Sequence, residues 1–353
     1  MNLLSSAPTC SDRPRCRYRS RISALLALFL AVLGTAPASA QETWVVNVVG
    51  LGGAPEYTET FTGWATELEE HLTTRWGVAA DRVITLGEDP SMQGIDGESR
   101  RETIEATVAR IASDASPSAR VLFVLIGHGS FRNDEASLNI PGRDLDAAEW
   151  NDLLEALGDR TTAVVNVASS SGPFAGALAA TGRIVITATR SGQERNETQF
   201  GRYFAEAFGG GAADLDKDGR LSLLEAFVYA RSETARYYEE EGLIATEHAQ
   251  IDDDGDGEAI DIPVEGGTDG AVASTFRFTS ASASASADAR PAASDSTSMR
   301  IEAEIAEIEA ELAILRSRRD EMTQEEYDAE LESLLVDLAL KNRELRGRSG
   351  GEA

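Results

Sequence analysis

The chain has 353 residues, of which 60 are acidic and 32 are Lys or Arg, giving a formal net charge of −28. This length suits one large core or two domains. The negative charge argues against binding to nucleic acid or to anionic membrane surfaces and favours attraction of cations. An acidic surface that only keeps the protein soluble is the simpler explanation of the same charge.

The first 40 residues have the pattern of a secretory signal peptide. An apolar run at 22–33, short for a membrane span, follows a basic region that contains Arg13, Arg15, Arg17, Arg19 and Arg21. Ala38-Ser39-Ala40 fits the cleavage pattern, so we expect a secreted or periplasmic chain from Gln41, without stable membrane insertion; an uncleaved anchor is the alternative. Both cysteines lie in the removed segment, which excludes a disulfide framework from the mature chain.

Between residues 41 and 279, short apolar runs alternate with amphipathic stretches, which indicates a single α/β domain. Helical spacing of apolar residues predicts helices within 61–76 and 100–112. Strands without polar residues predict a mostly parallel sheet covered by helices on both faces. The predicted strands span residues 43–49, 82–86, 120–126, 161–167 and 183–187.

Two of these strands end in polar sequences. Gly-His-Gly-Ser at 127–130 follows one strand, and Ala-Ser-Ser-Ser-Gly at 168–172 follows the next. Ligands and chemistry in such sheets lie at the carboxyl ends of the strands, so His128 and Ser169 are candidate site residues. The simpler alternatives are a strand-to-loop turn with a satisfied histidine, and a serine run that caps a helix at 173–178.

The order and spacing of these motifs resemble those of the caspase/legumain-type cysteine peptidases, where one strand ends in His-Gly and the next in Ala-Cys-x-Ser-Gly. The resemblance covers residues 43–278 and implies a caspase-like fold. It places Ser169, or Ser170 after a slip of one residue, at the position of the nucleophilic cysteine. It also implies that His128 is the catalytic histidine and that Gly129 donates to the oxyanion. Arg190 would lie near the substrate pocket, although a surface arginine is the simpler interpretation.

Serine in place of cysteine changes the chemistry. A thiol with a pKa of about 8.5 supplies some thiolate at neutral pH, whereas a serine hydroxyl supplies essentially none. Serine therefore needs a base in direct hydrogen-bond contact. In the peptidases that the chain resembles, histidine and cysteine flank the substrate without such contact. The leading interpretation is a catalytically degenerate scaffold that binds a protein or peptide; an active hydrolase using Ser169 and His128 is the alternative.

Residues 214–225 match the calcium-binding loop of an EF-hand at every diagnostic position. Carboxylates occupy positions 1, 3 and 5, a glycine occupies position 6, and a glutamate occupies position 12. Three glycines at 209–211 interrupt the entering helix, which departs from a regular helix–loop–helix. The candidate ligands for Ca²⁺ are Asp214, Asp216, Asp218, the carbonyl of Arg220, Ser222 through a water molecule, and Glu225.

A second acidic segment at 252–257 repeats the Asp-x-Asp-x-Asp-Gly pattern, with Asp252, Asp254 and Asp256 as candidate ligands. Position 12 of this repeat is Pro263, so the closing glutamate is missing. A partial calcium site and a simple acidic turn are both compatible with this sequence.

Beyond the α/β domain, residues 280–298 are rich in Ser and Ala, which predicts a flexible linker. Apolar residues at steps of three and four within 299–347 predict a helical hairpin or coiled coil. These helices could self-associate or fold back as a solvated pair. A third functional alternative is a calcium-dependent interaction module that contacts its partner through them.

Overall fold

The computed structural model describes residues 42–263 and 268–280, together with single positions between 308 and 343. All of them belong to one unit of the chain, Ala40–Ala353. The predicted signal peptide lies outside the described residues, as do residues 281–298 of the predicted linker and most of the predicted hairpin. In the part of the chain that the structure does describe, no helix combines the length and the apolar character needed to cross a membrane.

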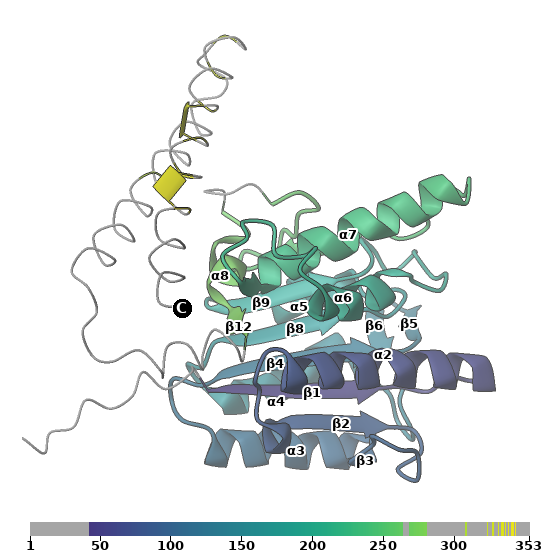
Figure 1. Ribbon diagram of the computed structural model, residues 1–353. Helices are drawn as coiled ribbons and strands as arrows, with labels where there is room; N and C mark the ends of the chain where they lie inside the picture. The colour runs from purple at the N-terminus through teal and green to yellow at the C-terminus, as the bar shows by residue number, and fades with distance from the viewer. Residues whose placement is uncertain are drawn as a thin grey trace, which may run out of the picture. The chain divides into compact units, whose positions relative to one another are not determined.

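A seven-stranded sheet forms the centre of the domain, in the order β11-β9-β8-β4-β1-β2-β3 (Figure 1). Every neighbouring pair is parallel except β11 and β9, which are antiparallel. The predicted mostly parallel sheet is therefore confirmed, and the antiparallel edge strand adds to it. The strands are β1 (Thr43–Val49), β2 (Val83–Gly87), β3 (Gly97–Glu98), β4 (Arg120–Ile126), β8 (Thr162–Asn166), β9 (Arg183–Thr187) and β11 (Gln250–Asp252).

The central strands are apolar because both faces of the sheet are covered. Along β1, Val45 and Val49 point into one hydrophobic cluster, whereas Trp44, Val46 and Val48 point into the other. Helices α2 (Pro55–Thr74), α6 (Phe200–Gly209) and α7 (Leu223–Glu240) contribute to the first cluster. Helices α3 (Arg101–Asp114), α4 (Ala147–Leu154) and α5 (Pro173–Leu178) contribute to the second.

Two smaller sheets complete the domain. Immediately after β4, strands β5 (Gly129–Arg132), β6 (Glu135–Leu138) and β7 (Leu145–Asp146) form an antiparallel meander. Near the acidic loop, β10 (Arg220–Ser222) pairs with β12 (Arg277–Thr279). A short helix, α8 (Ala271–Thr275), precedes β12, and single 3₁₀ turns lie at Ala80–Arg82 and Glu155–Leu157. The sequence did not predict these short elements.

Candidate functional site

The segments that follow β4 and β8 approach each other closely at the carboxyl edge of the sheet. The amide of Gly129 donates a hydrogen bond to the Ser169 hydroxyl at 3.2 Å, and this hydroxyl lies 3.4 Å from the Gly129 carbonyl oxygen. A Cβ on Gly129 would lie only 2.0 Å from the Ser169 carbonyl oxygen. The strand ends can meet here because residue 129 has no side chain. Ser169 itself is buried, with 4% of its surface exposed.

His128 lies beside this contact but interacts with other groups. Its imidazole packs edge-on against the rings of Tyr57 and Phe61, with centroids 4.8 and 5.0 Å away. It also lines an open cavity of about 500 Å³, together with residues of β5 and β6. Among the described residues, no hydrogen bond joins the His128 imidazole to the Ser169 hydroxyl, which bonds instead to the backbone of Gly129. The arrangement thus differs from the nucleophile–base contact that an activated serine makes.

The serine run is fixed by hydrogen bonds to the loop that follows β9. The Ser171 hydroxyl lies 3.2 Å from the Thr189 hydroxyl, and the Gly172 amide donates to the same threonine at 2.9 Å. Ser170 adopts a left-handed conformation with φ +58°, and its buried hydroxyl has no hydrogen-bond partner. The serine run forms the loop between β8 and α5, as the simpler interpretation expects, but Gly172 is the N-cap and no side chain caps this helix.

Glu194 connects this loop to His248, a pair that the sequence analysis did not predict. Its backbone carbonyl accepts the Ser170 amide at 2.8 Å. Its carboxylate accepts the amide of Arg190 at 2.8 Å and lies 2.6 Å from Nδ1 of His248. The Arg190 side chain is 60% exposed and 3.8 Å from Glu194, which is the surface position expected from the simpler interpretation. Glu194 and His248 are 54 residues apart, so no local pattern reveals the pair.

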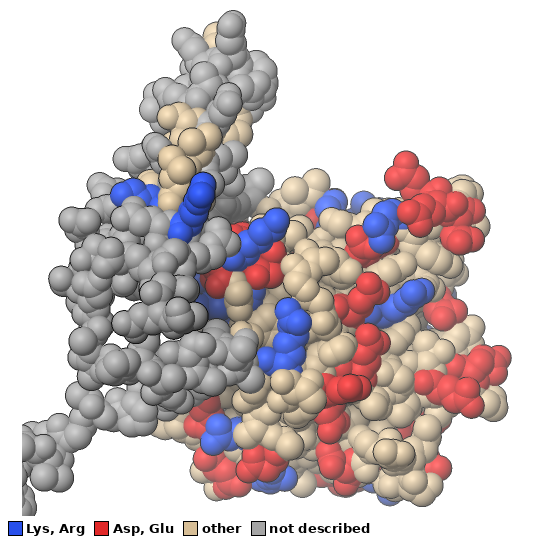
Figure 2. All heavy atoms as spheres, in the orientation of Figure 1, with Lys and Arg blue, Asp and Glu red and all other residues tan. Residues whose placement is uncertain are grey.

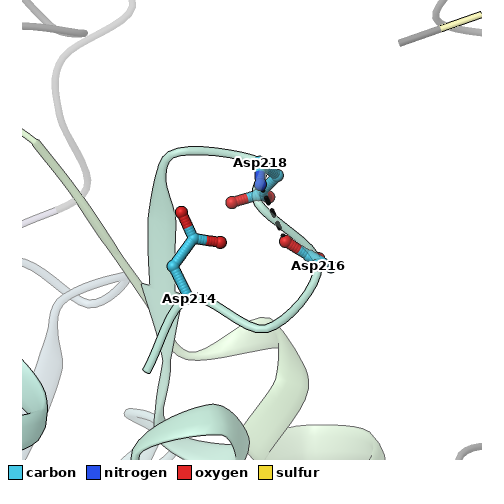
Figure 3. Close-up of side chains that lie close together, drawn as sticks. All are labelled: Asp214, Asp216 and Asp218. Atoms are coloured by element: carbon cyan, nitrogen blue, oxygen red, sulfur yellow. Dashed lines mark hydrogen bonds between the residues drawn. The ribbon is translucent and has the colours of Figure 1, made fainter. Parts of the chain in front are cut away.

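The first acidic loop brings three carboxylates together. Asp214, Asp216 and Asp218 each offer an oxygen within 4.8 Å of the others, and Figure 3 shows all three side chains turned toward the middle of the loop. The Gly219 amide donates to Asp214 at 3.0 Å, and the Asp218 amide donates to Asp216 at 2.9 Å. Positive φ angles at Lys217 and Gly219, +59° and +81°, produce the sharp turn, which is why glycine suits position 6.

The remaining predicted ligands lie around the same loop. Glu225, in the first turn of α7, accepts the Leu215 amide at 3.0 Å with one oxygen and the Ser222 amide at 2.8 Å with the other. Ser222 accepts the Glu225 amide in return, which completes a capping box at the start of α7. Arg220 begins β10, where Leu221 pairs with Phe278. The structure therefore groups three of the six candidate ligands, the aspartates, and bonds Glu225 to backbone amides of the same segment.

The electrostatics of this loop favour a bound cation. Oδ1 of Asp214 is buried and accepts no hydrogen bond. Desolvation of its carboxylate, together with the charges of Asp218, Glu225 and Asp214, raises the pKa of Asp216 to about 6, although the residue as a whole is exposed. Arg277 lies 3.6 Å from Asp218 and offsets part of the negative charge. An orphaned carboxylate oxygen among other carboxylates is what a hard divalent cation satisfies.

The second acidic segment forms a cluster that differs from the predicted one. Asp252 and Asp254 each offer an oxygen within 4.8 Å of an oxygen of Asp269, and Asp256 is not in this group. Burial raises the pKa of Asp252 and that of Asp269, and the negative charge of Asp254 acts in the same direction on both. Two groups of three aspartates in the described residues could thus hold a metal ion.

Outside these clusters, the acidic residues are dispersed. Figure 2 shows Asp and Glu side chains spread over the visible face, with Lys and Arg side chains between them. This distribution fits a generally negative surface.

The chain matches no protein-family model, and none of the curated proteins compared with it matches it. The fold is therefore established at the level of its architecture: a mixed, mostly parallel α/β sheet of seven strands with helices packed on both faces.

Proposed function

We propose that this chain is a secreted or periplasmic calcium-binding protein, built on a catalytically inactive relative of the caspase/legumain-type peptidases that serves as a scaffold for a protein or peptide partner. Asp214 provides the observation that carries the proposal. One of its oxygens is buried without a hydrogen bond, inside a loop whose sequence fits an EF-hand at every diagnostic position. A buried acceptor without a partner is costly, and a calcium ion would remove this cost.

The donor set favours calcium over softer metals. The loop offers carboxylates, a hydroxyl and backbone carbonyls, without histidine or cysteine, and such oxygen ligands suit hard cations. Asp214, Asp216 and Asp218 would bind the ion directly, with the Arg220 carbonyl and, through water, Ser222. Glu225 would exchange its hydrogen bond with the Leu215 amide for the ion, and calcium binding would thereby reorganise the start of α7.

The inactive scaffold rests on the surroundings of Ser169. Its hydroxyl is buried and bonded to the Gly129 amide, the group that the resemblance implies as an oxyanion donor. The His128 imidazole packs against aromatic rings. A hydroxyl with a pKa far above neutrality needs a base in contact with it, and the aromatic packing of His128 supports another role for that imidazole. The cavity beside His128 is then the candidate site for an extended peptide.

Calcium titration by calorimetry tests the metal proposal. The purified protein is compared with a variant carrying Asp214→Asn and Glu225→Gln, and with Asp81→Asn, which removes an exposed charge far from the loop in sequence. We expect the double variant to bind one equivalent of calcium fewer than the wild type, and Asp81→Asn to bind as many. Equal stoichiometry in the wild type and the double variant would refute calcium binding at this loop.

A fluorophosphonate probe tests the inactive scaffold, because it labels only activated serines. We expect no labelling of Ser169 in the wild type, which is the same result as for the Ser169→Ala variant. Labelling that disappears in Ser169→Ala would overturn the scaffold proposal and favour the hydrolase, in which His128 turns toward Ser169.

A further inference from the structure

Three carboxylates from two separate segments meet at the edge of the large sheet. Asp252 ends strand β11, Asp254 lies in the turn that follows, and Asp269 lies just before α8. Asp252 and Asp269 are almost completely buried, with 0% and 2% of their surfaces exposed. Within the described residues, no ion pair with Lys, Arg or His reaches any of the three. The cluster therefore concentrates negative charge in a buried region, and no described Lys, Arg or His side chain forms an ion pair with it.

One carboxylate oxygen of Asp252 has no hydrogen-bond partner among the described residues. Its Oδ1 accepts the Gly255 amide at 3.0 Å, but its Oδ2 is buried and accepts no hydrogen bond. A buried carboxylate oxygen without a donor loses its hydration and gains nothing in return. Two further carboxylates lie within 4.8 Å, and one cation would satisfy this oxygen and both neighbours at once.

Hydrogen bonds join the two segments that carry the cluster, the turn after β11 and the start of α8. The carboxylate of Asp253, which is not part of the cluster, accepts the amides of Gly270 at 2.8 Å and Ala273 at 2.7 Å, at the start of α8. Its own amide donates to Oδ1 of Asp269 at 2.9 Å. These bonds hold Asp252, Asp254 and Asp269 in place before any ion binds, which lowers the entropic cost of binding.

The turn after β11 repeats the first half of the EF-hand-like loop. The amide of Asp256 donates to Asp254 at 3.0 Å, as the amide of Asp218 donates to Asp216 in the first loop. Positive φ angles also recur at the equivalent positions, +83° at Gly255 and +80° at Gly257. The sequence then departs from the pattern, because Pro263 stands where the closing glutamate belongs.

We propose that Asp252, Asp254 and Asp269 form a second calcium site, in which Asp269 supplies the closing carboxylate that the local sequence lacks. The ligands are again oxygens only, which suits a hard cation, and their origin in two chain segments suits the flexible coordination of Ca²⁺ better than the strict octahedron of Mg²⁺.

This second ion ties the sheet edge to the segment that supports the first loop. Residues 269–279 continue through α8 into β12, and β12 pairs with β10 of the first loop, with Phe278 opposite Leu221. Calcium at the second site would therefore stabilise β12, the strand that pairs with β10 of the first loop. We expect it to increase the affinity of the first loop for calcium.

Calcium titration of the full chain by calorimetry tests the second site with two variants that make the same change of charge. Asp269→Asn removes the proposed third ligand. Asp256→Asn is the matched control, because it lies in the same acidic turn and fits the sequence repeat but stands outside the cluster. We expect two equivalents of calcium for the wild type and for Asp256→Asn, and one for Asp269→Asn. Two equivalents in Asp269→Asn, or a loss in Asp256→Asn instead, would overturn the assignment.

The outcomes distinguish this proposal from the proposal that the first loop binds calcium. A wild type that binds one equivalent, lost in the variant of Asp214 and Glu225, refutes the second site. A single equivalent lost in Asp269→Asn supports the second site and refutes the first. If Asp269→Asn fails to fold, as judged by circular dichroism in chelator, Asp252→Asn replaces it, because asparagine Oδ1 still accepts the Gly255 amide. Asp252→Asn that retains two equivalents would refute the site.

Discussion

Gly129→Ala tests the close approach of the two strand ends. The added Cβ would lie 2.0 Å from the carbonyl oxygen of Ser169, whereas real Cβ atoms essentially never approach another atom within 3.0 Å. The two groups must therefore separate by about 1 Å or more. The atom in the way, the Ser169 carbonyl oxygen, belongs to the backbone and not to a flexible side chain. It lies just after β8, which is paired on both sides with the parallel strands β4 and β9.

The expected cost lies at the upper end of overpacking, about 3 kcal/mol or more. For a domain of this size, thermal unfolding should shift down by about 6–12 °C. The assay is thermal denaturation followed by circular dichroism, with a urea series to obtain the free energy of unfolding. Alanine retains the backbone amide, so the experiment separates the packing role of residue 129 from any role of its N–H group.

Gly63→Ala is the control, because Gly63 lies within α2 and a Cβ there meets nothing within 4 Å. The same substitution should stabilise the protein by about 0.5–1 kcal/mol at this position, since glycine is a poor helix former. A melting temperature for Gly129→Ala within about 2 °C of the wild type would show that the strand ends lie further apart, and the reasoning about Ser169 would fail with it.

Three further perturbations test other parts of the structure. Leu221→Ala removes a buried side chain from β10 and should cost about 2–5 kcal/mol in urea unfolding; a cost below 1 kcal/mol would contradict its burial. Glu247→Gln weakens the acceptor for the Gln199 and Phe200 amides at the start of α6, and chemical denaturation should show a loss of about 1–2 kcal/mol; unchanged stability would contradict this contact. In chelator, Asp216→Asn should gain stability relative to the wild type as pH rises from about 4 to 6. The folded-state pKa of Asp216, about 6, exceeds its ordinary value of 3.8, so ionisation of this side chain disfavours folding between these pH values. A difference in melting temperature that does not change with pH would contradict the raised pKa.

The large strands were predictable because each is a nearly uninterrupted apolar run. Strands β1, β4 and β9 have the predicted bounds, and β2 and β8 differ from prediction by one residue at each end. Runs of this kind are required wherever helices cover both faces of a parallel sheet. Strands β3 and β11 escaped prediction because they contain two and three residues, with Gly, Glu, Gln and Asp among them. Their place in the sheet comes from tertiary contacts, which periodicity does not register.

Local sequence patterns have the same limit at the candidate metal sites, because they reveal only residues that lie close together in the sequence. The first aspartate cluster was predictable because Asp214, Asp216 and Asp218 lie within five consecutive residues, in a pattern typical of a calcium-binding loop. In the second cluster, the sequence repeat favoured Asp256, but the hydrogen bonds of Asp253 to residues 269–273 bring Asp269 into the cluster instead. Asp269 has no neighbouring motif, and only the folded chain reveals it. The contact of Glu194 with His248 was missed for the same reason.

The narrow edges of the large sheet bear on aggregation. An edge strand with free amides and carbonyls is a template on which another chain can add a strand. Here β3 has two residues, and β11 is paired on its outer side by Ile260, which exchanges two backbone hydrogen bonds with Ile251. The half-buried Asp254 and the exposed Asp256 then place charge beside that border. Short strands, the pairing by Ile260 and the charges of the acidic turn therefore disfavour edge-to-edge growth of a strongly apolar sheet.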